Sequence, residues 1–425
     1  MFRIQILGWI GLACAAPAWA AGADDDALSL ADATSATTKT VRSDWRIFTE
    51  LSAGQVALRQ FAGSDVTADA QRLSVDVLFD KKLTQEWRAV FSDRLDLSRQ
   101  SSPTASPDKT LNTLKETYLS WQPQSNRVLD AGRINARYGL AQGYNPTDFL
   151  RDGANRSITS VDPDSIRENR MGTAMLRGQM LWAGGSLTAI AAPKLADAPN
   201  DSSWSADLGS TNNRNRWLLA ASHPYSEGLN PQVMLFGDDQ QPVQMGLNLT
   251  TLFNDATVLH LEWSGGRMPS QLAKALTSSP HKTFRNKVAT GLTYTTSNKI
   301  SLTAEYHYNG AAPTPSEWDT VRSGSPLDYA RYRLLTQDKL ELVTRHAAFF
   351  RGTWQDAFIH KLDLAAMLRS NQDDHSRLFW LEARYRLDKT EFAMQWQLTS
   401  GDAGTEYGTY PQHRNLQVLG RYFFE

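Results

Sequence analysis

The sequence predicts an all-β protein, a transmembrane antiparallel β-barrel of about 18 strands, with 16 strands as the alternative. From residue 45 onward, apolar and polar residues alternate over runs of about ten positions, as they do in strands. The polar rows carry full charges and large amides, and the apolar rows begin and end in aromatic residues. The mean hydropathy of -0.44 excludes a helical membrane protein, whose spans each need about 20 mostly apolar residues.

The first 20 residues have the pattern of a signal peptide. Arg3 supplies the positive charge, residues 4–16 form an apolar stretch, and Ala18-Trp19-Ala20 is a small-x-small cleavage site. Cleavage near Ala20 predicts export. It also removes Cys14, the one cysteine of the chain, so the mature protein has neither disulfides nor thiol chemistry.

The rest of the chain divides into two parts. Residues 21–44 are polar and lack an apolar pattern, which predicts a flexible periplasmic leader. Residues 45–425 are predicted to form the barrel. The strands are expected to start near residues 45, 70, 85, 111, 126, 170, 185, 214, 231, 242, 256, 284, 299, 345, 358, 376, 389 and 415.

The connections between these strands alternate between two kinds. Short turns such as Asn254-Asp255 alternate with longer segments, among them residues 139–169 and 309–344. An outer-membrane barrel has short periplasmic turns and long external loops, and its even strand number puts both termini in the periplasm. The chain is therefore expected in the outer membrane of a Gram-negative bacterium, in contact with membrane lipid and lipopolysaccharide.

Three of the long segments allow a closer prediction. Residues 139–169 are expected to fold into the pore mouth. Residues 309–344 form a lid or a constriction, or else a solvated surface loop, and residues 327–342 have helical spacing. Residues 270–276 are expected to form a short external helix that Ser270 caps.

Assigning the polar row of each strand to the lumen collects more basic than acidic residues. An excess of guanidinium groups would favour anionic solutes. The other interpretation is that opposite charges pair across the lumen and only stabilise it. The candidate pore residues are Arg88, Arg94, Glu116, Arg133, Asn135, Arg137, Arg177, Glu262, Arg285, Glu305, Arg351, Glu382 and Arg384.

Residues 132–148 form the most informative motif. Arg133, Asn135 and Arg137 are expected to project into the lumen from one strand, and Gly139 and Gly143 to let the chain turn at the external rim. Asn145-Pro146 initiates a turn. Asp148 is expected to bond to local backbone or to receive an arginine.

This motif resembles one in outer-membrane barrels related to the alginate-export porins. The matching positions are Gly132, Arg133, Gly139, Asn145, Pro146 and Asp148, and the tract 114–121 precedes them. The resemblance covers residues 111–148 and implies an arginine-rich lumen that conducts an anionic polysaccharide. The chain departs from the family pattern at Ile134, where the family usually has glutamine.

The last strand suggests how the barrel is inserted. Leu416, Val418, Gly420, Tyr422 and Phe424 form an alternating outward row that resembles the signal read by the barrel-assembly machinery, although Glu425 follows the final aromatic residue. The row is otherwise only an amphipathic last strand. Energy for export would come from a gradient or from a partner in the periplasm or inner membrane.

Catalysis is not expected. The strand-borne histidines His260, His307 and His346 stand in no nucleophile motif, and no spacing predicts a metal site, a cofactor or nucleic-acid binding. The sequence therefore predicts a channel or exporter for a polar, anionic solute or polymer. The alternatives are a plugged barrel that acts as an envelope scaffold or surface-binding protein and, as a weaker one, an outer-membrane hydrolase.

Overall fold

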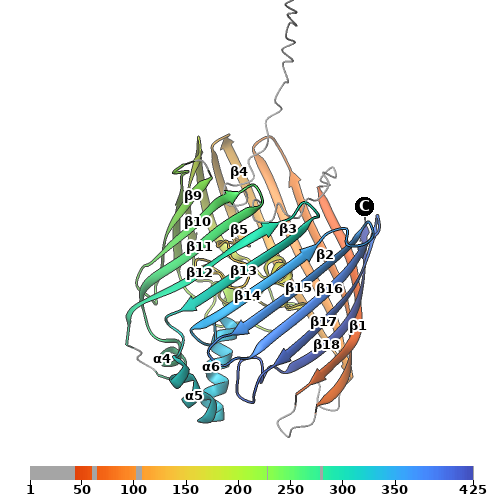
Figure 1. Cartoon of the computed structure of the whole chain (residues 1–425). Helices are drawn as coiled ribbons and strands as arrows, with labels where there is room; N and C mark the ends of the chain where they lie inside the picture. The colour runs from red at the N-terminus through yellow and green to blue at the C-terminus, as the bar shows by residue number, and fades with distance from the viewer. Residues whose placement is uncertain (1–43, 60–64, 102–107, 227, 278–280, 425) are drawn as a thin grey trace, which may run out of the picture.

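Eighteen strands pair with their neighbours in chain order, and the last pairs with the first, so the sheet closes on itself (Figure 1). This computed structural model describes residues 44–59, 65–101, 108–226, 228–277 and 281–424. The strands are β1 (Trp45–Leu58), β2 (Val66–Lys82), β3 (Trp87–Ser101), β4 (Lys109–Gln124), β5 (Arg127–Ile134), β6 (Thr173–Trp182), β7 (Gly185–Ala192), β8 (Arg216–Ser222), β9 (Leu229–Asp238), β10 (Gln244–Asn254), β11 (Thr257–Met268), β12 (Thr283–Thr295), β13 (Ile300–Asn309), β14 (His346–Trp354), β15 (Leu362–Asn371), β16 (Arg377–Arg386), β17 (Thr390–Ser400) and β18 (Gln412–Phe424).

The barrel and its strand number are confirmed, and the 16-strand alternative is wrong. Each strand starts within four residues of its predicted position. The predicted signal peptide and nearly all of the predicted leader lie outside the described residues. We call the end of the barrel with the short connections the turn end and the opposite end the loop end. The first residues of β1 and the last of β18 pair at the turn end, with Ile47 opposite Phe424.

The outer face of the barrel is apolar. Leu51, Val233 and Val418 point outward with 61%, 55% and 56% of their surface exposed. Aromatic residues gather at the turn end, where Trp87 stacks on Trp121 at 5.9 Å between ring centroids. An exposed apolar band with aromatic borders matches a lipid environment. No helix in the described part of the chain is both long and apolar enough to cross a membrane.

The wall is uneven in height. β2 has 17 residues, whereas β5, β6, β7 and β8 have 8, 10, 8 and 7. β4 therefore extends past its neighbour β5 toward the loop end, and loop backbone pairs with this part of β4 in place of a strand. Gly172 N–H donates to Lys115 O, and Asn112 N–H donates to Ser203 O, each at 2.8 Å.

Helices cover the loop end. The predicted helix after Ser270 is confirmed as α4 (Gln271–Leu276), with the Ser270 side chain accepting from Ala273 N–H. α5 (Pro315–Ser323) and α6 (Pro326–Asp338) lie beside it, below the barrel in Figure 1. Trp318 and Tyr332 are fully buried between these helices. Segment 309–344 is therefore a packed helical cover rather than a solvated loop.

Candidate functional site

The connection between β5 and β6 folds into the barrel, and we call its residues 135–172 the inner loop. β5 ends at Ile134, because Asn135 N–H donates to the Glu116 side chain at 2.9 Å instead of continuing the sheet. The prediction that Arg133, Asn135 and Arg137 share one strand is therefore wrong for Asn135 and Arg137. Arg133 remains on β5, where it is buried and donates to the carbonyls of Leu114, Ala206 and Asp207.

Two wall carboxylates hold the first turn of the inner loop. Glu262 on β11 accepts from the N–H groups of Leu140 and Ala141, and from the Thr147 hydroxyl at 2.9 Å. Glu305 on β13 accepts from Gln142 N–H and Gly143 N–H at 2.7 and 2.9 Å. Backbone N–H groups that converge on a carboxylate form strong charge-assisted bonds, so residues 140–147 are fixed against this wall.

The close contact between the inner loop and the wall accounts for the glycines at positions 139 and 143. Gly139 has a φ of +101°, and a Cβ at Gly143 would lie 2.5 Å from His307 Cε1 and 2.7 Å from Phe349 Cγ. Both glycines lie inside the lumen against β11, β13 and β14. Their predicted place at the external rim is wrong, because the wall carboxylates draw the chain inward.

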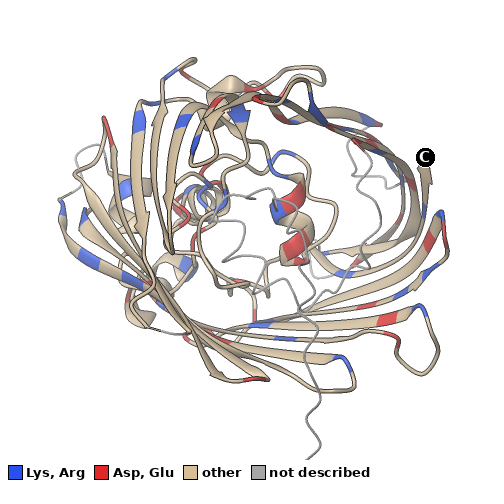
Figure 2. Cartoon of the chain, turned by 90° about the horizontal axis from the view of Figure 1, so that it is seen from above, with Lys and Arg blue, Asp and Glu red and all other residues tan. Residues whose placement is uncertain are grey.

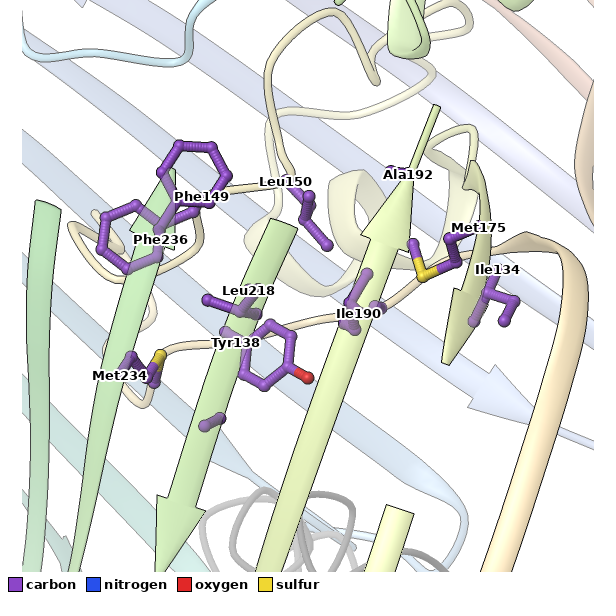
Figure 3. Packing of buried hydrophobic residues seen from close by; sticks show 12 residues of the cluster. Ile134, Tyr138, Phe149, Leu150, Met175, Ile190, Ala192, Leu218, Met234 and Phe236 are labelled. Carbon is purple, nitrogen blue, oxygen red and sulfur yellow. The ribbon is translucent and has the colours of Figure 1, made fainter. Parts of the chain in front are cut away.

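The second part of the inner loop packs on an apolar patch inside the barrel (Figure 3). Phe149 stacks on Phe236 of β9 at 4.9 Å between ring centroids, and Leu150 and Tyr138 join the same cluster. Residues from four neighbouring strands complete it: Met175, Ile190, Ala192, Leu218, Ala220, Met234 and Phe236. On β6–β9 the lumen row is thus partly apolar, contrary to the assignment of polar rows to the lumen.

Asn145 and Asp148 serve the inner loop itself. The Asn145 amide donates to Ala141 O and Glu262. Asp148 accepts from Arg170 at 2.6 Å, and Arg170 also donates to Asn135 Oδ1 and Ala136 O. Of the two partners predicted for Asp148, local backbone or an arginine, the structure has the arginine.

A short helix at the end of the inner loop lies within the opening of the barrel (Figure 2). It is α2 (Pro163–Asn169), capped by Asp162. Arg351 of β14 contacts Asp162 at 3.0 Å and Asp164 at 2.6 Å, and Arg46 of β1 contacts Glu168. Burial raises the pKa of Asp162 to about 6, although Arg351 opposes that shift.

The lumen wall from β4 through the closure of the barrel to β16 carries a balanced charge network, which we call the seam network. Glu50 of β1 accepts from Arg72, Arg94 and Arg421 at 2.9, 3.2 and 2.7 Å. Five cations alternate with five carboxylates: Lys115, Asp76, Arg94, Asp96, Arg72, Glu50, Arg421, Glu391, Arg384 and Glu382. The candidates Arg94, Glu382 and Arg384 belong to it.

The remaining candidates lie apart from one another. Arg88 pairs with Asp80, and Arg177 pairs with Asp130 at 2.8 Å. Arg285 donates to Gly310 O at 2.8 Å. Arg137 is exposed and has no hydrogen bond or ion pair to any described residue. Gly132, with a φ of +140°, lies where a Cβ would be 2.3 Å from Thr117 O, so it serves close strand packing.

A pocket at the loop end gathers more cations than anions, and we call it the loop-end pocket. Its empty volume is about 750 Å³, including space open to solvent. Five cations line it, Arg151, Arg214, Lys274, Lys287 and Lys339. Four carboxylates also line it, Asp148, Asp152, Asp238 and Glu341. Asp148 is engaged by Arg170, and Asp338, outside the lining, contacts Lys339 at 3.4 Å, so four carboxylates face the five cations and one positive charge is in excess.

Four of these cations have carboxylate partners. Glu341 contacts Arg151 at 3.0 Å and Lys287, while Asp152 contacts Arg214 at 2.7 Å and Lys339 at 3.1 Å. Burial alone would raise the pKa of Glu341, but Lys287 and Arg151 outweigh it and lower that pKa to about 2. Asp152 is held far below its usual pKa in the same way, by Lys339 and Arg214.

Lys274 on α4 is the exception. It has no carboxylate within 4.0 Å among the described residues. Its side chain is exposed. Desolvation lowers the pKa of its ammonium group, Asp152 opposes that shift, and Lys339 and Arg214 add to it.

The inner loop separates this pocket from a vestibule at the turn end. The vestibule has an empty volume of about 2100 Å³, including space open to solvent, and Leu140, Gln142 and His260 line its inner side. Pro146 and Asp148 line the loop-end pocket instead. Residues 140–148 therefore lie between the two spaces. Among the described residues, no three His, Cys, Asp or Glu side chains gather in a way that could hold a metal ion.

Comparisons with known proteins bear on the fold. The barrel superposes on Pseudomonas aeruginosa OccK5 (OpdH) with a TM-score of 0.53 and 10% identity, over 90% of this chain and 98% of the other. OpdQ of the same organism matches with a TM-score of 0.53 and 9% identity, over 90% and 99%. Acinetobacter baumannii OccAB4 matches with a TM-score of 0.52 and 7% identity, over 91% and 100%.

The chain shares their fold. No protein-family model and no curated protein matches the sequence. At these identities the likeness concerns the fold alone. The relation to alginate-export porins, predicted from residues 111–148, stays a prediction.

The cations of the loop-end pocket were largely missed from the sequence. Arg151, Arg214, Lys274 and Lys339 lie in loops or on short helices, where no alternation assigns a face. One signal was present for Lys274. It is the fourth residue of a helix whose cap, Ser270, was recognised, but the partner of that helix could not be read from spacing.

Proposed function

We propose that the protein is an outer-membrane channel that passes small anionic solutes through the lumen of its barrel. The apolar outer band and the fold shared with the Occ proteins support the membrane location. The observation that carries the anion preference is the cation excess of the loop-end pocket, with Lys274 lacking an ion-pair partner among the described residues.

Transport of this kind needs electrostatics rather than chemistry. A pocket lined by one sign of charge concentrates counter-ions at the mouth of a channel. An anion would meet Lys274 first, because Lys274 is exposed, whereas Arg214 is buried against Asp152 and Asp238. The seam network adds no net preference, because its charges are balanced. The inner loop would set the size of the passage toward the vestibule.

The test is the reversal potential of the purified protein in planar bilayers under a KCl gradient. We expect chloride to be preferred, and Lys274→Gln to reduce that preference. Lys109→Gln on β4 removes an exposed lysine outside the pocket and should leave it unchanged. Cation selectivity of the unmodified protein would overturn the proposal.

A further inference from the structure

A second pocket, on the opposite side of the inner loop, contains no charged side chain. It lies between residues 158–161 and the lumen face of β16–β18, and its empty volume is about 380 Å³, part of it open to the lumen. Five amide side chains from β17 and β18 line it: Gln395, Gln397, Gln412, Asn415 and Gln417. We call it the amide pocket.

The seam network fixes the orientation of two of these amides. Arg384 donates to both oxygens of Glu382, at 2.8 and 2.9 Å, so Glu382 is held as an acceptor. Gln395 Nε2 donates to Glu382, and Gln417 Nε2 donates to Gln395 Oε1 at 2.6 Å. Each amide can donate two hydrogen bonds and accept two, so both retain capacity in a defined orientation.

Other polar groups of the pocket lack partners. Trp380 is 3% exposed, yet its indole N–H donates to no described residue. The side-chain amides of Asn415 and Gln412 also make no hydrogen bond within the described part of the chain. Gln412 is exposed and Asn415 half-exposed, so these amides face solvent. The pocket therefore combines two oriented amides with polar groups that are free to bind a ligand.

We propose that the amide pocket binds an uncharged saccharide, with its hydroxyl groups paired to these amides and to the Trp380 indole N–H. A hydroxyl both donates and accepts, so a ring bearing several matches a wall that offers both kinds of group. Trp380 and Tyr410 supply the apolar surfaces that would face the carbon skeleton. The absence of lining charge leaves a charged ligand unpaired here. This inference goes beyond the anion path and depends on the channel only for access.

The experiment measures binding and transport of maltose by the full-length protein. Isothermal titration in detergent measures the affinity for maltose without requiring an open pore. Block of the single-channel current by maltose shows whether the sugar reaches the lumen. We expect Gln417→Leu and Trp380→Phe each to weaken maltose binding about tenfold, which corresponds to about 1.4 kcal/mol. Gln179→Leu, a lumen glutamine of β6 bonded to Thr188, is the matched control and should bind like the unmodified protein.

Several results would overturn the proposal. The first is that maltose does not bind, and the second is that both pocket variants bind maltose as tightly as the unmodified protein does. The third is that the tripeptide triglycine binds as tightly as maltose, because its amides could satisfy the same groups. Heat-dependent mobility in gels verifies that each variant is folded. The reversal potential is recorded in the same bilayers. Loss of maltose binding with anion preference intact rejects only the saccharide site, and the converse rejects only the anion path.

Discussion

We expect pH to change the charge of the lumen through Asp162. Its pKa of about 6, raised by burial, means that it is ionised at pH 7 and protonated at pH 5. The group of Arg351, Asp162 and Asp164 then changes from a net charge of -1 to neutral, so the lumen loses one negative charge.

We therefore expect anion preference to rise as the pH falls through about 6. Reversal potentials between pH 7.5 and 5 measure it. Asp162→Asn should show the low-pH selectivity throughout, whereas Asp197→Asn, a change at an exposed loop residue, should keep the step. A step of unchanged size in Asp162→Asn would contradict the assignment.

Gly143 shows how closely the inner loop lies against the wall. A methyl group there would collide with His307 and Phe349, so Gly143→Ala requires the loop to move or the wall to give way. Overpacking of this kind costs about 1–3 kcal/mol. We expect faster tryptic cleavage within residues 135–172 and a larger conductance. Gly178→Ala on β6, where a Cβ meets nothing within 4 Å, should change neither.

The residues also show where sequence reasoning succeeded and where it did not. Two partners were predicted for Asp148, local backbone or an arginine, and the structure has the arginine. The partners of Glu262 and Glu305 were not predicted. They are backbone N–H groups more than 100 residues away in the chain, and no pattern of spacing encodes such contacts.

Among the elements, the strands were predictable and the inner loop was not. A strand between lipid and lumen must alternate apolar and polar residues, so its position can be predicted from its own residues. The end of β5 depends instead on Glu116, which takes Asn135 N–H out of the sheet. The apolar lumen rows of β6–β9 depend on the loop that covers them.

The attachment of the inner loop as an element can be tested at Glu262. Glu262→Gln replaces one carboxylate oxygen with an NH₂ group that faces N–H donors, so hydrogen bonds to residues 140–147 are lost. Leaving buried donors unsatisfied costs about 1–3 kcal/mol. Hydrogen exchange of Leu140 and Ala141 should accelerate correspondingly, whereas Gln142 and Gly143 donate to Glu305. Glu86→Gln at the turn end is the control, and unchanged protection in Glu262→Gln would disprove the attachment.

For the whole molecule, the seam network joins the two ends of the sheet. Glu50 on β1 contacts Arg421 on β18, and three arginines depend on this one carboxylate. Breaking a buried ion pair costs about 3–5 kcal/mol. We expect Glu50→Gln to lower the temperature at which the barrel unfolds in detergent, followed by heat-dependent gel mobility. Asp108→Asn removes the exposed pair with Arg99 and should have almost no effect, whereas equal losses would contradict this role.

Sequence reasoning left two interpretations of the lumen charges open, an anion path or ion pairing. The structure contains a balanced network on one wall and a cation excess near the loop end. Alternation assigns a residue to a face of the sheet, but not to a partner on another strand. The charges could therefore be predicted as lumenal, while their balance could be found only from the folded barrel.

The uneven wall has a consequence for the surrounding lipid. At about 3.3 Å per residue and a tilt of about 45°, the seven residues of β8 span only about 16 Å of membrane thickness, and the 17 of β2 about 40 Å. Around β5–β8 the bilayer thins, the molecule leans, or loop backbone such as Ser203, which pairs with β4, replaces strand at the outer surface. Each of these makes the two sides of the barrel different, so the neighbours of the protein in the membrane would meet it from a particular side.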